Sequence, residues 1–66
     1  MRFLRLTDLY GNLQLINLDH VDSFYLSEYK GQMITKVGLS AGVFLPVRET
    51  ISEISLLLQS NDLIIQ

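Results

Sequence analysis

The sequence predicts an α+β fold in which a small antiparallel sheet of about five short strands is followed by one C-terminal helix. Two observations lead to this prediction. The first 48 residues consist of short apolar stretches separated by turn residues, which is typical of strands. The following residues carry a helix start signal and apolar side chains at helical spacing. In a chain of 66 residues we therefore expect one small domain, divided into a sheet (1–48), a helix (50–59) and an apolar tail (60–66).

The first two predicted strands form a hairpin. Residues 2–7 alternate between two faces, and residues 13–17 continue as a second apolar stretch. The intervening residues 8–12 are predicted to be the turn, because Gly11 and Asn12 both tolerate positive φ. Two strands separated by such a short turn favour antiparallel pairing.

A polar break at residues 17–20 precedes the third predicted strand. Its Asn and Asp residues favour turns because their side chains bond to nearby backbone groups. Residues 21–29 are rich in β-branched and aromatic side chains, which is typical of a strand. A glycine turn at residues 30–32 then leads into a fourth strand over residues 33–39.

A second glycine turn, at residues 40–42, leads into a fifth strand over residues 43–47. Pro46 lacks a donor N–H, so we expect this strand to lie at a sheet edge or to end early. Gly38 lies inside the fourth strand, where an isolated glycine indicates a bulge or a close backbone contact.

The helix is predicted from about residue 51 to residue 59. Thr50 and Glu53 have the spacing of a capping box, in which each side chain bonds to a free backbone N–H at the helix start. The apolar residues that follow share one helical face. They are Ile51, Ile54, Leu57 and Leu58.

The apolar tail has three alternative interpretations. It can be a frayed end that lies on the chain's own core, a short strand or plug that docks on a neighbouring subunit, or a disordered end. An exposed end with strand-forming residues is otherwise an aggregation hazard. The apolar residues concerned are Leu63, Ile64 and Ile65.

The high apolar content predicts a homo-oligomer. Hydrophobic residues make up 48% of the chain and the mean hydropathy is +0.30. A domain of this size buries only about 60% of its unfolded surface, and a chain without cysteine has no disulfides to compensate. Apolar surface left exposed usually marks an interface. The expected interface residues are Ile54, Leu57, Leu58, Leu63, Ile64, Ile65, Tyr25 and Tyr29.

Charge and hydropathy argue against several classes of protein. The formal net charge is −2, and the five basic residues are spread along the chain, which argues against nucleic-acid binding. No apolar run approaches the roughly 18 residues of a membrane-spanning helix. The N-terminal residues lack the apolar core of a signal peptide, so we expect a cytoplasmic protein.

The sequence predicts no enzyme and no catalytic, cofactor-binding or metal-binding residue. Asp19, His20 and Asp22 form the one cluster with suitable side chains, and we interpret them as a solvated loop. None of the serines lies in a nucleophile motif.

Four aromatic residues raise the question of base stacking. Of these, only Tyr25 and Tyr29 share a strand face, and few basic residues accompany them. Packing in the core or at an interface is therefore the favoured interpretation. The four residues are Tyr10, Phe24, Tyr25 and Tyr29.

A set of residues along most of the chain follows a pattern found in a known family. They are Leu6-Thr7, Gly11, Ile16-Asn17, Val21, Phe24, Val47-Arg48-Glu49-Thr50 and Glu53-Ile54. In these residues and in the order of its elements, the chain resembles the FlbD, or swarming-motility, family of short bacterial proteins. The resemblance implies a non-enzymatic accessory protein linked to flagellar motility, and it supplies no catalytic residue. Similar short proteins also occur in phages and mobile elements.

Three functional hypotheses follow. The first is an accessory or adaptor protein that acts through protein–protein contacts and self-association. The alternative is a phage or mobile-element regulator that contacts nucleic acid, or an acidic inhibitor that occupies the basic groove of a nucleic-acid-binding host protein. The third is a small-ligand pocket between subunits, indicated only by the tyrosines and His20. The acidic residues of the inhibitor hypothesis are Asp8, Asp19, Asp22 and Glu28.

Overall fold

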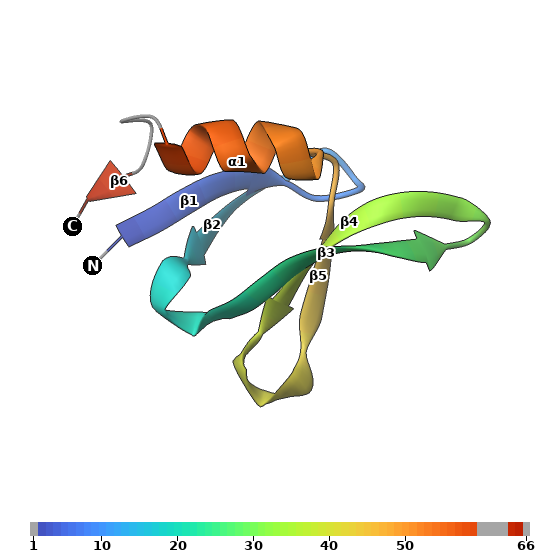
Figure 1. Cartoon of the computed structure of the whole chain (residues 1–66), viewed down its shortest axis with the longest axis horizontal. Coiled ribbons are helices and arrows are strands. Elements are labelled where there is room, and N and C mark those ends of the chain that lie inside the picture. Colours follow the sequence, from blue (N-terminus) through green and yellow to red (C-terminus); the bar gives the residue numbers. More distant parts are fainter. Residues whose placement is uncertain (1, 60–63, 66) are drawn as a thin grey trace.

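A computed structural model describes residues 2–59 and 64–65, and it confirms a small α+β protein with a C-terminal helix (Figure 1). The predicted bounds of the first three strands and of the helix agree with the structure. The elements in chain order are β1 (Arg2–Thr7), β2 (Leu13–Asn17), the 3-10 helix η1 (Leu18–His20), β3 (Val21–Tyr29), β4 (Gln32–Leu39), the 3-10 helix η2 (Ser40–Gly42), β5 (Phe44–Val47), α1 (Ile51–Gln59) and β6 (Ile64–Ile65).

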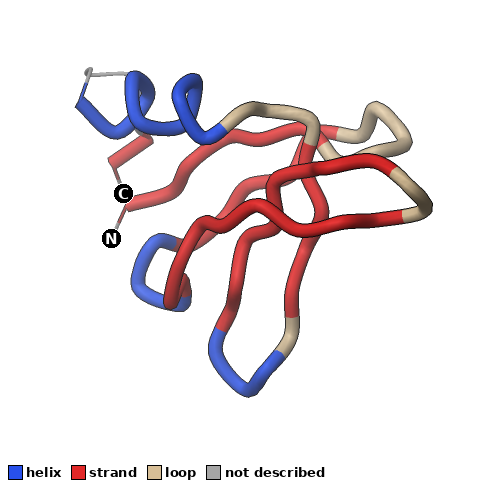
Figure 2. Tube along the Cα trace, turned by 45° about the vertical axis from the view of Figure 1, so that its right-hand side comes forward, coloured by secondary structure: helices blue, strands red, loops and turns tan. Residues whose placement is uncertain are grey.

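The strands form two three-stranded antiparallel sheets, where the sequence predicted a single sheet. One sheet has the order β2-β1-β6 and the other β3-β4-β5. The division falls at the polar break, where the Asn17 side chain accepts a 3.0 Å hydrogen bond from the backbone N–H of Asp19 and caps η1. Because η1 turns the chain there, β3 pairs with β4 and not with β2. Figure 2 shows the two groups of strands with α1 beside them.

The predicted hairpin turns are confirmed by their backbone conformations. Gly11 has φ of 87° in the turn between β1 and β2. Lys30 and Gly31, with φ of 50° and 81°, form the two-residue loop between the paired residues Tyr29 and Gln32. Positive φ at both loop positions is the requirement of a type I′ turn, whose twist matches that of the flanking strands.

Gly38 lies opposite a bulge in β3 and at a close contact between the two strands, which are the two alternatives that the sequence left open for it. The register between β3 and β4 shifts between Val21 and Ser23, which face the Gly38 end of β4. A Cβ atom on Gly38 would lie 3.2 Å from the Ser23 hydroxyl oxygen and 3.4 Å from the Tyr25 ring. Glycine therefore lets the two strands approach closely at the bulge.

Val47 connects the two sheets. It pairs with Thr35 of β4 and also forms an isolated antiparallel bridge with Asp8, directly after β1. Val47 is 1% exposed, so this connection lies inside the molecule. The preceding Pro46 lies on β5, an outer strand of its sheet, which confirms the predicted edge position.

Two hydrogen-bonded contacts after Val47 strengthen this connection. The Arg48 backbone N–H donates to the Thr7 carbonyl at 2.8 Å. The Thr7 N–H in turn donates to both carboxylate oxygens of Glu49, at 2.9 and 3.0 Å. The Glu49 side chain thus replaces the backbone acceptor that a neighbouring strand would provide.

The helix α1 begins with the predicted capping box. Thr50 N–H donates to Glu53 Oε1 at 3.0 Å, and Glu53 N–H donates to Thr50 Oγ1 at 3.1 Å. No described helix is long and apolar enough to cross a membrane.

The core lies between the two sheets and the helix. Its buried hydrophobic residues are Leu4, Leu6, Ile16, Val37, Val47 and Ile54.

Candidate functional site

The outer face of the β3-β4-β5 sheet carries a group of aromatic side chains around a lysine. The register places Tyr25 opposite Lys36. Lys36 in turn lies opposite Pro46 of β5, and Phe44 lies two pairs further along, on the same face as Lys36. Tyr29 is on the same face of β3 as Tyr25, as the alternation in the sequence predicted.

The two lysines on this face contact the aromatic rings. Lys36 Nζ lies 4.4 Å from the ring centroid of Phe44 and 5.9 Å from that of Tyr29. Lys30 Nζ lies 5.4 Å from the Tyr29 centroid. Both arrangements are within the range of cation–π attraction. We call Tyr25, Tyr29, Lys30, Lys36 and Phe44 the aromatic–lysine face.

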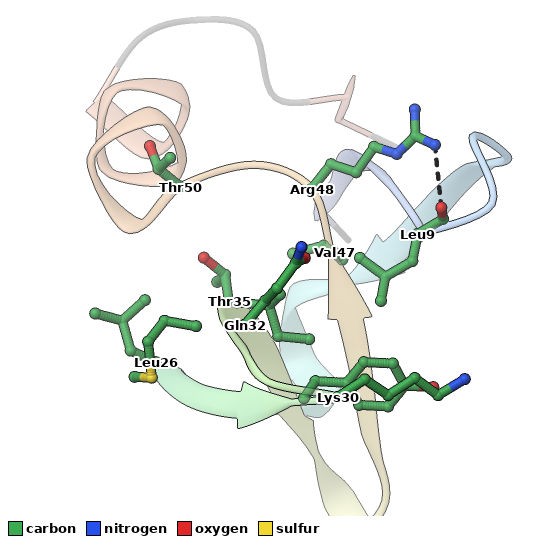
Figure 3. A pocket seen from close by; sticks show the side chains of 11 residues that line it. Leu9, Leu26, Lys30, Gln32, Thr35, Val47, Arg48 and Thr50 are labelled. Atoms are coloured by element: carbon green, nitrogen blue, oxygen red, sulfur yellow. Dashed lines mark hydrogen bonds between the residues drawn. The ribbon is translucent and has the colours of Figure 1, made fainter.

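A pocket of about 570 Å³ opens beside this face, where β5 separates from β4 (Figure 3). Its volume is within the range of small-molecule and peptide side-chain sites. We call it the edge pocket. It is lined by Leu9, Leu26, Tyr29, Lys30, Gln32, Met33, Ile34, Thr35, Val47, Arg48 and Thr50.

One edge of β4 is unpaired inside this pocket. Tyr29 and Gln32 flank a two-residue loop, so they form a hydrogen-bonded pair. Because hydrogen-bonding direction alternates along a strand, the N–H and C=O of Met33 point toward the opposite edge, on the side of β5. The β4–β5 pairing ends at Thr35 and Val47, so β5 does not reach Met33.

The two charged residues that line the edge pocket are both cationic. They are Lys30 and Arg48, and no acidic residue among those that the structure describes lines the pocket. The Arg48 guanidinium is positioned by a 3.0 Å hydrogen bond to the Leu9 carbonyl. Glu28, which pairs with Met33 across the hairpin, is exposed and does not line the pocket. The site therefore combines apolar walls, two cations and an unpaired strand edge.

The predicted interface residues of the helix fall into different environments. Ile54 is 1% exposed and packs in the core, so its assignment to an interface is wrong. Leu57 is half-buried against the same core, because it lies three positions further along the same helical face. Leu58 is 38% exposed and remains on the surface.

Of the three apolar tail residues predicted at an interface, the structure describes two. Leu63 lies outside the described residues. Ile64 and Ile65 form β6, whose backbone pairs with Phe3 and Arg2 of the same chain. The short strand that the sequence offered as one alternative therefore pairs within the chain.

Asp8 does not belong to an acidic surface, which corrects one residue of the inhibitor hypothesis. It is 8% exposed, and its carboxylate accepts hydrogen bonds from the backbone N–H groups of Tyr10 and Asn12, both at 2.9 Å, and from the Gln14 side-chain amide at 3.0 Å. These bonds, led by the one from Asn12 N–H, lower the pKa of Asp8 below its ordinary value of 3.8.

The Asp19, His20 and Asp22 cluster is exposed at η1 and the start of β3. Within residues 2–59 and 64–65, no three His, Cys, Asp or Glu side chains lie close enough together to hold a metal ion. Of the other aromatic residues, Tyr10 is 83% exposed in the first turn and Phe24 packs against the core.

Sequence reasoning did not identify Lys36, Phe44 or Arg48 as site residues. Lys36 and Phe44 belong to different strands, and only the β4–β5 register brings them together. The signal available in the sequence was the alternation of residues along each predicted strand, which indicates the face of a side chain but not the register between strands.

Comparison of the chain with protein-family models, with curated proteins and with solved structures finds no match.

Proposed function

We propose that this chain is a small non-enzymatic accessory protein that acts through protein–protein contacts and self-association. The observation that carries the proposal is the edge pocket, which joins an unpaired strand edge to apolar walls and two cations. A cytoplasmic location and a role in motility, the latter from the resemblance to the FlbD family, belong to the same proposal.

The pocket favours an extended partner segment that carries acidic and apolar residues. The Met33 backbone groups offer a donor and an acceptor to an added strand, as in peptide recognition by β-augmentation. Leu26 and Met33, exposed by 60% and 65%, provide apolar contacts for one face of that strand. Lys30 and Arg48 complement acidic side chains on its other face.

The test is a binding titration with a fluorescein-labelled peptide of alternating valine and glutamate. Such a peptide places its valines on one face and its glutamates on the other when extended. We expect Lys30→Asn to weaken binding about two- to fivefold, because one exposed charge pair contributes up to about 1 kcal/mol. Asparagine tolerates the positive φ of this position, so the hairpin turn is retained.

Arg5→Gln is the matched control, because it removes one exposed positive charge from the other sheet. It should leave the peptide affinity within twofold of the unmodified protein. Equal affinity for a peptide of alternating valine and lysine would contradict the proposed site, as would equal losses in the two variants.

The second candidate function is contact with single-stranded nucleic acid. It is favoured by Tyr25 and Phe44, exposed by 38% and 47%, beside Lys36 on the aromatic–lysine face. Aromatic side chains of this kind stack on bases, while cations follow the backbone. A labelled oligothymidine titrated at low and at physiological salt tests it. Salt-sensitive binding that is lost in Phe44→Ser would support this function over the first.

A further inference from the structure

Among the edge strands of four or more described residues, β2 alone lacks a protective device, and the remaining edge strand, β6, is only two residues long. The free edge of β3 carries Asp22, Glu28 and a bulge, and β5 carries Pro46. Charges, bulges and proline are the features that keep strand edges from pairing with another chain. By contrast, β2 has no charged residue, no proline and a regular register with β1.

The hydrogen bonds of β1 show which β2 groups face this edge. Thr7 pairs with Leu13, but both Thr7 backbone groups bond on the other side, to Glu49 and Arg48. Thr7 and Leu13 are therefore a non-hydrogen-bonded pair, and the N–H and C=O of Leu13 point away from β1. Two residues further on, those of Leu15 point the same way.

The side chains of the same two residues are exposed on the outer face of the sheet. Leu13 is 62% exposed and Leu15 is 54% exposed. An uncharged strand edge that carries exposed leucines is a favourable surface for strand pairing with another chain. It fits a second copy of itself, because antiparallel pairing about a twofold axis places identical edges against each other.

We propose that two copies of this chain associate through the β2 edge, with Leu13 of each copy opposite Leu15 of the other. This register satisfies the free backbone groups of both residues and places their exposed side chains side by side. It forms one continuous antiparallel sheet across the dimer. The inference rests on the self-association part of the proposed function and identifies its surface.

Charge does not oppose this arrangement. The nearest basic residue on the outer face of the sheet, Arg5, lies on β1 opposite Leu15. In the dimer the two Arg5 strands are separated by three strand spacings, or about 14 Å. Exposed charges at this separation are beyond the screening length of about 8 to 10 Å at physiological salt.

The interface is small, so the dimer is weak and depends on protein concentration. Light scattering at about 20 μM and at about 1 mM, concentrations chosen to bracket weak association, should show the apparent mass rise from 7.5 kDa toward twice that value. In the same samples, amide exchange at Leu13 and Leu15 should slow, by about tenfold once nine tenths of the chain is dimeric.

The decisive variant is Leu15→Glu. It removes an exposed leucine without altering the core, and Arg5 across the strand pair favours the new carboxylate. We expect this variant to remain a monomer at both concentrations. Leu56→Glu, at a residue that is 65% exposed on α1, is the matched control and should still form the dimer. If Leu15→Glu does not fold, Leu13→Glu makes the same test.

A dimer that persists in Leu15→Glu, or a monomer at both concentrations in the unmodified protein, would overturn this inference. Peptide binding by the Leu15→Glu monomer separates the two proposals. Retained binding with lost dimerisation supports both the edge pocket and the β2 interface. No peptide binding by an unmodified protein that dimerises, with the dimer lost in Leu15→Glu, would instead count against the pocket alone.

Discussion

The Asp8 carboxylate organises the turn that follows it and so controls where β1 ends. Its hydrogen bonds to Tyr10, Asn12 and Gln14 fix the chain within six residues, while its backbone bridges to Val47. A single residue thereby links a local turn, through its side chain, to the contact between the two sheets, through its backbone.

Asp8 should make stability depend on pH in the acid range. Its pKa in the folded protein lies below 3.8, mainly because Asn12 N–H bonds to the charged form. The stabilisation is therefore complete above the unfolded pKa and is lost as the pH falls through the folded pKa. We expect the stability difference between the unmodified protein and Asp8→Asn to shrink between about pH 7 and pH 2.

Urea unfolding at several pH values measures this difference. Asp22→Asn, at an exposed position of β3, is the control for removing one negative charge. A stability difference for Asp8→Asn that stays constant down to the lowest pH would show that the turn does not depend on the charged carboxylate.

At the scale of elements, the helix is specified by residues close together in the chain. Thr50 and Glu53 satisfy each other's backbone N–H groups, and Ile54 directs the helix onto the core. Because a capping box acts within one turn, its spacing in the sequence was sufficient to predict the helix start. The same is true of the Lys30-Gly31 turn and of Pro46 at a sheet edge.

Thr50→Ala should destabilise the protein by about 1 kcal/mol, the usual effect of removing an N-cap side chain. Thr50→Ser keeps the hydroxyl acceptor and should lose only a small part of this stability. The midpoint of urea unfolding distinguishes the two variants. Equal losses would indicate that the threonine methyl group, and not the hydroxyl, stabilises the helix start.

At the scale of the whole molecule, the arrangement into two sheets could not be read from local patterns. Glu49 reaches Thr7 across 42 positions of the chain, and β6 pairs with the first residues of β1. No short-range spacing encodes such contacts. For the same reason the sequence predicted Ile54 as exposed at an interface, because the extent of the core depends on how the sheets meet.

Glu49→Ala should weaken the connection between the sheets. It leaves the half-buried Thr7 N–H without its acceptor, and such a loss costs about 1 to 3 kcal/mol. That is a large part of the roughly 3 to 10 kcal/mol expected for a chain of this length. Glu49→Gln retains one acceptor oxygen and should be less destabilised. Urea unfolding measures both variants, and unchanged stability of Glu49→Ala would contradict the role of this carboxylate.

The candidate site depends on the same long-range order. Met33 has no strand partner on the β5 side because β5 leaves the sheet at Val47, where it bridges to Asp8, and this departure opens the edge pocket. The sequence identified Tyr25 and Tyr29 on one strand face, but only the assembled sheet adds Phe44 and Lys36.

The link between Thr7 and Glu49 also has a consequence for the nascent chain. At a synthesis rate of about 5 to 20 residues per second, the 42 positions between these residues take roughly 2 to 8 s to translate. The β1–β2 hairpin can form within microseconds, long before its partner segment exists. The inner face of the hairpin is therefore uncovered for seconds during translation. This interval is when a chaperone would have the most time to bind it.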